Sequence, residues 1–240
     1  MSVTRTWHNG RFCNQLIRNL CVSLIAKCND LKVEYSSNDR MQRLGLILFS
    51  GNKSYSHYIE LNDENFMSIL NAKEICANLE PNCAFFQTEQ ISSFLYRVLR
   101  IDAFRESIIA ANPFKARYGT NNDCFVHIRL TDLADVNQGI GYYKQAILQH
   151  PHDNLWIASD DFSHPLIKEL CEVYPKADLV LKDEVETIQF GSTCKHLVLS
   201  LGSYSAIVGY LGYNTETVLY PGDADYHKSM FTCIPLWKSL

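Results

Sequence analysis

Short apolar runs alternate with helix-like stretches along the second half of the chain. Apolar runs of four or five residues are typical of buried strands, and apolar positions that recur every three or four residues are typical of helices. Five strands are expected, at 125–129, 155–158, 177–181, 196–200 and 217–220. Four helices are expected between them, at 142–149, 165–173, 184–190 and 204–211. Because such alternation is typical of a parallel sheet covered on both faces, we predict a Rossmann-like domain over 119–240.

The first half opens with a similar unit and then becomes harder to interpret. A strand at 3–7 precedes a polar loop, a helix with one apolar face from Leu16 to Cys28, and a second strand at 31–35. A later helix is expected at 88–100, with Thr88 as its N-cap. Breaker residues between 112 and 123 place the domain boundary near 118. We therefore expect an α/β protein with two Rossmann-like domains facing a cleft, the N-terminal one, 1–118, being reduced.

Composition limits the classes of function. The 240 residues carry a net charge of −4 and no strongly basic run, which argues against broad nucleic-acid binding. Apolar stretches fall short of the ~20 residues that span a bilayer, and residues 1–6 are polar, without the apolar core of a signal peptide. The nine cysteines include no Cys-x-x-Cys pair. These features predict a cytoplasmic protein without a membrane span, with reduced cysteines and no metal site.

The strand at 125–129 carries the strongest sign of chemistry. His127 and Arg129 share one face of this strand because side chains alternate along it. A guanidinium at the end of a parallel strand can bind phosphate through its planar fork of donors. The alternative is that Arg129 pairs locally with Asp132.

Polar residues also follow two neighbouring strands. Asp160 and Asp161 come after the strand at 155–158, where they can contact a metal, a base or a ribose, or where Asp161 can cap the next helix. The stretch Gly202, Ser203, Tyr204 and Ser205 opens a helix, so its amides can hold a phosphate or simply form an N-cap. Ligands of open α/β sheets bind beyond the carboxyl ends of the strands, which favours one binding site at this edge.

The loop from Gly10 to Gln15 separates the first strand from the first helix. It matches neither the G-x-G-x-x-G pattern nor the P-loop, which argues against the usual dinucleotide and ATP sites. Arg11, Asn14 and Gln15 are candidates to face the cleft, and a tight turn with an Asn14 cap is the alternative.

Together these motifs resemble the α-1,2-fucosyltransferases of glycosyltransferase family 11 and related fucosyltransferases. The segment 10–15, Gly-Arg-Phe-Cys-Asn-Gln, resembles the G-x-x-G-N-Q opening of that family. The segment 127–132, His-Ile-Arg-Leu-Thr-Asp, resembles its H-x-R-R-G/T-D motif, and 199–205 resembles its late Ser-rich motif. The resemblance implies a GT-B fold, a GDP-fucose donor, a glycan acceptor, inversion at the anomeric carbon and no metal or other cofactor.

The sequence departs from the family pattern at several positions. Cys13 replaces a glycine, Leu130 replaces the second arginine, and Ala206 and Ile207 replace two tryptophans. These changes leave the donor and the acceptor less certain than the fold.

The resemblance also suggests roles. Arg129 would neutralise the leaving diphosphate together with the amides at 203–205, and His127 with Asp160 or Asp161 would contact guanosine. Inversion needs a base for the acceptor hydroxyl, for which Asp132 is the first candidate and Asp135 the second. Substrate contacts are expected from Gly10, Arg11, Asn14, Gln15, Gly202, Ser203, Tyr204 and Ser205.

Three other functions stay open at this point. The donor can be GDP-mannose, GDP-rhamnose or a UDP-sugar. The chain can instead be a degenerate, non-catalytic module that binds a glycan or a nucleotide. An oxidoreductase or methyltransferase is disfavoured because the glycine fingerprint is absent.

Overall fold

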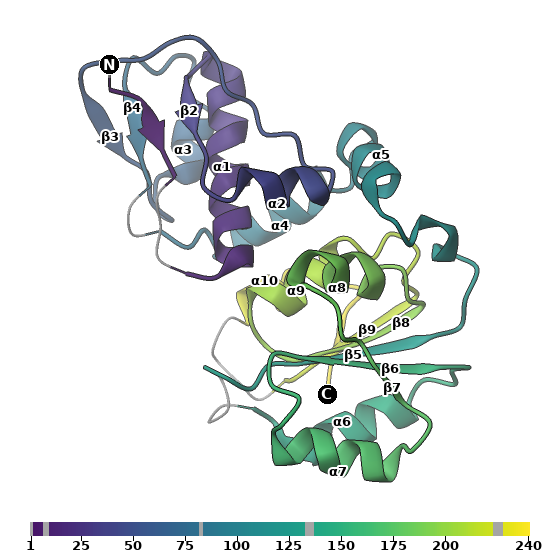
Figure 1. The fold of residues 1–240 in the computed structure, drawn as a ribbon. Helices are drawn as coiled ribbons and strands as arrows, with labels where there is room; N and C mark the ends of the chain where they lie inside the picture. Colours follow the sequence, from purple (N-terminus) through teal and green to yellow (C-terminus); the bar gives the residue numbers. More distant parts are fainter. Residues whose placement is uncertain (1, 7–9, 82–83, 133–136, 223–227) are drawn as a thin grey trace. The chain divides into compact units, whose positions relative to one another are not determined.

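The computed structural model describes residues 2–6, 10–81, 84–132, 137–222 and 228–240. The chain forms two compact units, Met1–Leu95 and Tyr96–Leu240 (Figure 1).

The second unit is built on a six-stranded sheet in which every strand pairs in parallel with its neighbours. Its strands, in chain order, are β5 (Cys124–Ile128), β6 (Leu155–Ser159), β7 (Asp178–Leu179), β8 (His196–Leu199), β9 (Thr217–Tyr220) and β10 (Lys238–Ser239). Their order across the sheet is β10-β9-β8-β5-β6-β7. The chain thus runs outward from β5 to one edge, returns to β8 beside β5, and continues to the other edge. This is the strand order of the Rossmann fold, so the predicted α/β class is confirmed at this level.

Helices cover both faces of the sheet (Figure 1). The helices α6 (Gly139–Leu148) and α7 (Pro165–Val173) lie on one face, where they connect β5, β6 and β7. The helices α8 (Glu184–Gly191), α9 (Ser203–Tyr210) and α10 (Ser229–Thr232) lie on the other. Two layers of helix therefore bury the apolar strands between them.

Alternation along β5 divides its side chains between these two layers. Cys124, Val126 and Ile128 belong to a buried cluster with apolar residues of α6 and α7. Phe125 points to the opposite face, where a Cβ added at Gly191 of α8 would lie 2.7 Å from its ring. His127, two residues further along, shares the face of Phe125. If β5 paired with its neighbours one residue out of register, His127 would instead point into the apolar cluster.

The predicted elements of this unit lie close to the observed ones. The helix at 165–173 and the strand at 217–220 have the predicted bounds, and α6 begins at Gly139 rather than at 142. The strand β7 is shorter than expected and forms one edge of the sheet. The strand β10 was not predicted, because two exposed residues show no apolar pattern; pairing with β9 creates it.

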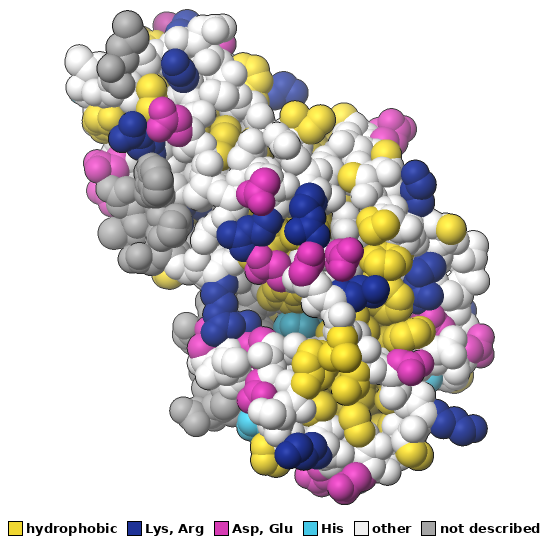
Figure 2. Space-filling view, in the orientation of Figure 1, with side chains coloured by type: hydrophobic (Ala, Val, Ile, Leu, Met, Phe, Trp, Pro, Cys, Tyr) yellow, Lys and Arg dark blue, Asp and Glu magenta, His cyan; other side chains and the backbone are white. Residues whose placement is uncertain are grey.

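The edge at β7 exposes apolar side chains. Val173, Leu179 and Leu181 are exposed there, and Figure 2 shows hydrophobic side chains gathered over this part of the unit.

The second unit begins earlier in the sequence than the predicted boundary at 118. It includes the end of α4 (Glu89–Val98), α5 (Asp102–Ala111) and the short helix η1 (Lys115–Arg117). Asn112 donates a 2.8 Å hydrogen bond to the backbone carbonyl of Gln189, and Arg117 forms a 2.6 Å ion pair with the buried Asp123. These contacts join the segment before 118 to the sheet, although its sequence reads as loop and breaker residues.

The first unit starts with the predicted strand–helix–strand arrangement. The strands β1 (Thr4–Arg5) and β2 (Val33–Glu34) pair in parallel, and α1 (Phe12–Asn29) connects them. A second parallel pair, β3 (Tyr58–Glu60) with β4 (Asn78–Glu80), follows α2 (Asn38–Arg43), and α3 (Phe66–Leu70) lies between β3 and β4 along the chain. Within the described residues the first unit thus holds two separate two-stranded sheets rather than one Rossmann-like sheet.

The helix at 88–100 was predicted from its apolar pattern and its N-terminal threonine. The structure has α4 at Glu89–Val98, and the Ile91 amide donates to Thr88 Oγ1 over 3.4 Å, as an N-cap requires.

Across the described ranges, none of the helices has both the length and the apolar character needed to cross a bilayer.

Candidate functional site

The strand order places a crevice at the carboxyl ends of β5 and β8. These two strands are neighbours, yet the chain leaves β5 toward α6 on one face and leaves β8 toward α9 on the other. Where the connections diverge in this way, an open α/β sheet has room for a ligand. His127 and Arg129 lie at the end of β5, and the stretch from Ser200 to Ser205 follows β8.

A small pocket lies at this edge. Arg129 and Ser200 line it from the ends of β5 and β8, and Pro221 lines it from the end of β9. The remaining lining residues, which the sequence analysis did not include among the site residues, are Asn137, Gln138, Tyr143 and Leu201. Their side chains mix apolar surface with amide and hydroxyl groups, as ligand pockets do. Pro221 could have been predicted from the sequence, because it directly follows the last predicted strand.

His127 is buried against the start of α9. Its Nδ1 lies 2.6 Å from Ser205 Oγ and 3.3 Å from Ser200 Oγ, and the two hydroxyl oxygens are 3.1 Å apart. The ring also stacks on Tyr204, with centroids 4.7 Å apart. Ser200 Oγ accepts a 3.1 Å hydrogen bond from the Arg129 amide. This network fixes the end of β5 to the loop after β8.

Burial lowers the pKa of His127 to about 3; nearby Asp160 opposes the shift and Arg129 reinforces it. The imidazole is therefore neutral near pH 7 and serves as a hydrogen-bonding group rather than as a cation for phosphate. Because His127 is 4% exposed and Ser205 is fully buried, these side chains hold the site in place from beneath it. This differs from the prediction that both contact the substrate directly.

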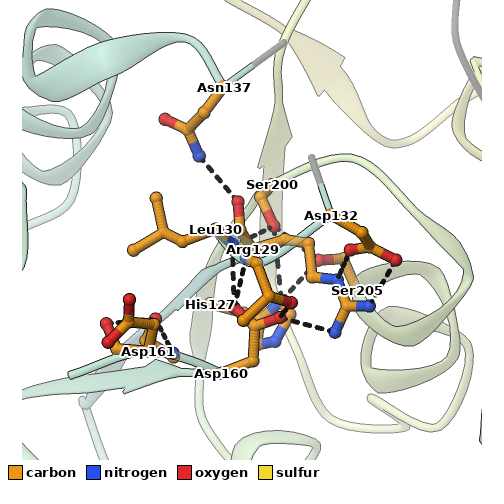
Figure 3. Close-up of polar contacts among 11 residues, drawn as sticks. His127, Arg129, Leu130, Asp132, Asn137, Asp160, Asp161, Ser200 and Ser205 are labelled. Carbon is orange, nitrogen blue, oxygen red and sulfur yellow. Dashed lines mark hydrogen bonds and ion pairs between the residues drawn. The ribbon is translucent and has the colours of Figure 1, made fainter. Parts of the chain in front are cut away.

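The Arg129 guanidinium lies between two carboxylates (Figure 3). Its Nε donates to Asp132 Oδ1 over 2.7 Å, and its Nη2 donates to Asp132 Oδ2 over 2.9 Å. Its Nη1 lies 2.8 Å from Asp160 Oδ2. The local pairing that the sequence left as an alternative is thus present, and Arg129 also lines the pocket. One cation and two anions occupy the same strand ends.

Asp160 is held by backbone as well as by Arg129. Its Oδ1 accepts a 2.8 Å hydrogen bond from the Leu130 amide, and its Oδ2 accepts one from the Thr131 hydroxyl. Burial would raise the pKa of Asp160, but the hydrogen bonds from Thr131 and Leu130 and the charge of Arg129 together lower it. Asp160 is therefore an ionised, fixed part of the site.

Asp161 lies apart from Arg129 (Figure 3). Its Oδ1 accepts hydrogen bonds from the Ser163 amide and hydroxyl, at 2.9 and 2.6 Å, and these contacts lower its pKa. The predicted cap is corrected in one detail, because the N-cap of α7 is His164, whose ring accepts from the Leu166 amide. Asp161 shapes the turn before that helix.

The start of α9 has the backbone that a close ligand needs. Gly202 immediately precedes the helix with φ 106° and ψ 160°, a conformation that essentially only glycine adopts. In the helix itself, Ser203 and Tyr204 are half-buried, and the Tyr204 hydroxyl donates to the Glu184 carbonyl over 2.6 Å. The N-cap residue of α9 is Gly202, which has no side chain to cap the helix. The N-terminus of a helix is a place where backbone amides and the helix dipole favour an anion.

The loop from Gly10 to Gln15 belongs to the first unit. Gly10 has φ 110°, and Arg11 is the exposed N-cap of α1. Asn14 Oδ1 accepts from Gln87 over 2.9 Å, and Gln15 donates to the Gly10 carbonyl over 3.0 Å and accepts from the Ser37 hydroxyl. Asn14 and Gln15 thus contact residues of their own unit, and their predicted contact with substrate stays a prediction.

Leu130 occupies the position where the resembled motif has a second arginine. Its side chain is 2% exposed and belongs to the apolar cluster with α6 and α7. That position faces the core here, so a cation there would be buried. Asp135, the second candidate base, lies outside the described residues.

Within the described residues, no three His, Cys, Asp or Glu side chains are grouped closely enough to hold a metal ion. No protein-family model matches the chain, and no curated protein matches it.

Proposed function

We propose that this protein is an inverting, metal-independent glycosyltransferase that uses a nucleoside-diphosphate sugar, with GDP-fucose as the first candidate donor and a glycan hydroxyl as the acceptor. The observation that carries the proposal is the position of Arg129. It lines a pocket at the carboxyl ends of β5, β8 and β9, beside the start of α9. A forked cation beside the N-terminus of a helix at one sheet edge suits a diphosphate.

The resemblance of segments 10–15, 127–132 and 199–205 to fucosyltransferases supplies the donor sugar and the GT-B organisation. On this proposal the second unit binds the nucleotide, and the first unit contributes to the acceptor side. The Rossmann strand order of the second unit supports the nucleotide role, because such sheets bind nucleotides at this edge.

The reaction would be a single displacement. The acceptor oxygen forms a bond to the anomeric carbon while the bond from that carbon to the diphosphate oxygen breaks. The acceptor proton passes to a carboxylate, with Asp132 as first candidate, and the bonding electrons leave on the diphosphate. Arg129 and the α9 amides stabilise the charge that develops on the leaving group, so a divalent cation is not needed for that step.

A specific observation also favours a second candidate function, a non-catalytic nucleotide- or glycan-binding module. Leu130 removes one cation from the motif, and Arg129 is already paired with Asp132 and Asp160. A module that binds a GDP-sugar without cleaving the bond between the sugar and the diphosphate would account for both features.

Nucleotide binding and turnover of Arg129 variants test the proposal. Titration calorimetry with GDP and UDP identifies which nucleobase the protein prefers, and GDP release from GDP-fucose measures turnover. Losing the Arg129 fork in Arg129→Ala should lower turnover about a hundredfold, equivalent to about 2.7 kcal/mol of transition-state stabilisation. Arg129→Lys should recover part of the loss, because it restores the charge but not the fork.

Lys168→Ala is the matched control, because Lys168 is an exposed cation on α7. It should behave like the unmodified protein. Normal turnover by a folded Arg129→Ala protein would contradict the proposal, and GDP binding without any GDP release from the donor would favour the binding module.

A further inference from the structure

We propose that Asp132 is a displaceable counterion of Arg129. On this view the diphosphate of the donor takes the place of the Asp132 carboxylate on the guanidinium, and the released carboxylate becomes available as the base. The inference rests on the proposed function and adds to it a coupling between donor binding and the availability of the base.

The geometry of the Arg129–Asp132 pair is that of a bound oxyanion. Nε and Nη2 form the side of the guanidinium that binds carboxylates and phosphates through two parallel hydrogen bonds. Asp132 occupies both positions, at 2.7 and 2.9 Å. A phosphate that uses this fork must therefore replace the Asp132 oxygens.

The two carboxylates on Arg129 differ in how firmly they are held. The Asp160 side chain is 18% exposed, and the Leu130 amide and the Thr131 hydroxyl bind its oxygens in addition to Arg129. The Asp132 side chain is 52% exposed and comes from the same short segment as Arg129, three residues along the chain. Because half of the Asp132 side chain already faces water, its carboxylate can exchange the guanidinium for solvent, whereas moving Asp160 would break backbone hydrogen bonds.

Charge also favours an exchange over simple addition. The cluster of Arg129, Asp132 and Asp160 carries one positive and two negative charges. A diphosphate added to the intact cluster would meet two carboxylates at close range, and like charges that close repel strongly. When Asp132 leaves the fork, the diphosphate meets the guanidinium directly, with Asp160 held on the far nitrogen, Nη1.

Release has a consequence for the reaction. A carboxylate held by two charge-assisted hydrogen bonds is a weak base, because those bonds stabilise its ionised form. Once free of Arg129, Asp132 accepts a proton more readily and remains close to the diphosphate end of the donor. Donor binding thus precedes and enables removal of the proton from the attacking hydroxyl.

Titration calorimetry with inorganic pyrophosphate tests the displacement directly, since it requires no knowledge of the nucleobase or the sugar of the donor. Asp132→Asn and Asp132→Ala should bind pyrophosphate at least about tenfold more tightly than the unmodified protein, because no carboxylate then competes for the fork. Arg129→Ala should lose this binding.

Asp161→Asn is the matched control. It removes one negative charge from the same edge of the sheet, and asparagine can keep the turn that Asp161 makes with Ser163. Its affinity for pyrophosphate should change far less than that of Asp132→Asn. Equal gains in the two variants would show a general field effect and would overturn the displacement.

A second readout separates release of a base from a merely structural role. With GDP-fucose and water as the attacking hydroxyl, Asp132→Asn should bind donor more tightly yet release GDP at least about a hundredfold more slowly. Faster or unchanged release would overturn the role of Asp132 as base.

The outcomes for the two proposals are distinguishable. If Arg129→Ala loses pyrophosphate but Asp132→Asn binds it as the unmodified protein does, the displacement fails and the diphosphate site stands. If neither the unmodified protein nor any variant binds pyrophosphate or GDP, the proposed function fails.

Discussion

At the scale of single residues, burial decides which polar side chains can do chemistry. His127 and Arg129 share one face of the same strand end, yet His127 is 4% exposed and neutral, whereas Arg129 reaches a pocket. Ser205 likewise turns inward to His127 rather than outward. The site therefore consists of charged residues, Arg129 with its two carboxylates, supported from beneath by the neutral, hydrogen-bonded pair of His127 and Ser205.

The neutral state of His127 predicts how stability depends on pH. An unfolded histidine has a pKa near 6.5, whereas burial holds the pKa of His127 at about 3 in the folded protein. Between these values the unfolded chain takes up a proton that the folded protein refuses. The free energy of unfolding should therefore fall as the pH drops below about 6.5, by up to about 1.4 kcal/mol per pH unit for this residue.

Urea unfolding between pH 7 and pH 5 measures this slope. His127→Asn should reduce it. His150, whose pKa burial and His196 lower to about 4, adds a slope of the same sign, so the His127→Asn protein should retain part of it. The aspartates with lowered pKa, Asp123, Asp160 and Asp161, affect stability only at lower pH. An unchanged slope in His127→Asn would contradict a neutral, buried imidazole.

At the scale of elements, the connection from β8 to α9 sets the geometry of the site. Gly202 turns the chain with φ 106° and ψ 160° directly after Ser200 and Leu201. This turn brings Ser205 under His127 and leaves the first amides of α9 at the edge of the sheet. The backbone conformation of Gly202 therefore controls both the support under His127 and the position of the first turn of α9.

Gly202→Ala should destabilise the protein by about 1–3 kcal/mol, because a side chain is strained in this region of φ and ψ. It should also weaken pyrophosphate binding, since the start of α9 must shift to relieve the strain. Denaturant unfolding and calorimetry measure the two effects on the same samples.

Gly141→Ala provides the control for any glycine replacement in this unit. Gly141 lies in α6, where an added Cβ meets nothing within 4 Å. Since alanine favours helix over glycine, this variant should gain about 0.5–1 kcal/mol of stability. Equal losses in the two variants would indicate that the conformation of Gly202 is unimportant.

At the scale of the whole molecule, the second unit contains every described contact of the Arg129 site. The residues that line the pocket and those that hold Asp160 and His127 all lie between Tyr96 and Leu240. The six-stranded sheet and its two helical layers belong to the same unit. Anion binding therefore should not need the first unit.

A fragment of residues 96–240 should fold cooperatively and bind pyrophosphate. A fragment of residues 119–240, which follows the boundary expected from the sequence, should be less stable by about 3 kcal/mol or more, because it leaves Asp123 without Arg117. It also loses the Asn112 bond to Gln189. Urea unfolding of both fragments measures the difference, and equal stability would favour the boundary at 118.

The local pattern of the sequence was enough to place most elements of the second unit. Apolar runs mark β5, β6, β8 and β9 because strands buried on both faces must be apolar throughout. Helical spacing gives the bounds of α7, because its Leu166, Ile167 and Leu170 must face the sheet together. The candidate edge also follows from sequence, since parallel strands all end on the same side.

The tertiary structure determined which strands and helices are neighbours. Neither the order β10-β9-β8-β5-β6-β7 nor the existence of β10 follows from local pattern, because strand order depends on how distant segments pack. The attachment of α5 and η1 to the sheet depends on contacts such as Arg117 with Asp123, which no periodicity reveals.

The same division applies within the site. The sequence by itself determined that His127, Arg129, Asp132 and Asp160 gather at strand ends, because covalent spacing and strand direction fix that. Only the folded chain decided that His127 is neutral and buried and that Arg129 holds two carboxylates. Burial and the pairing with Asp160 depend on atoms that are distant along the chain, such as Asp160 beside Arg129 and Ser205 beside His127. The hydrophobic packing of the sheet against its helices brings those atoms together.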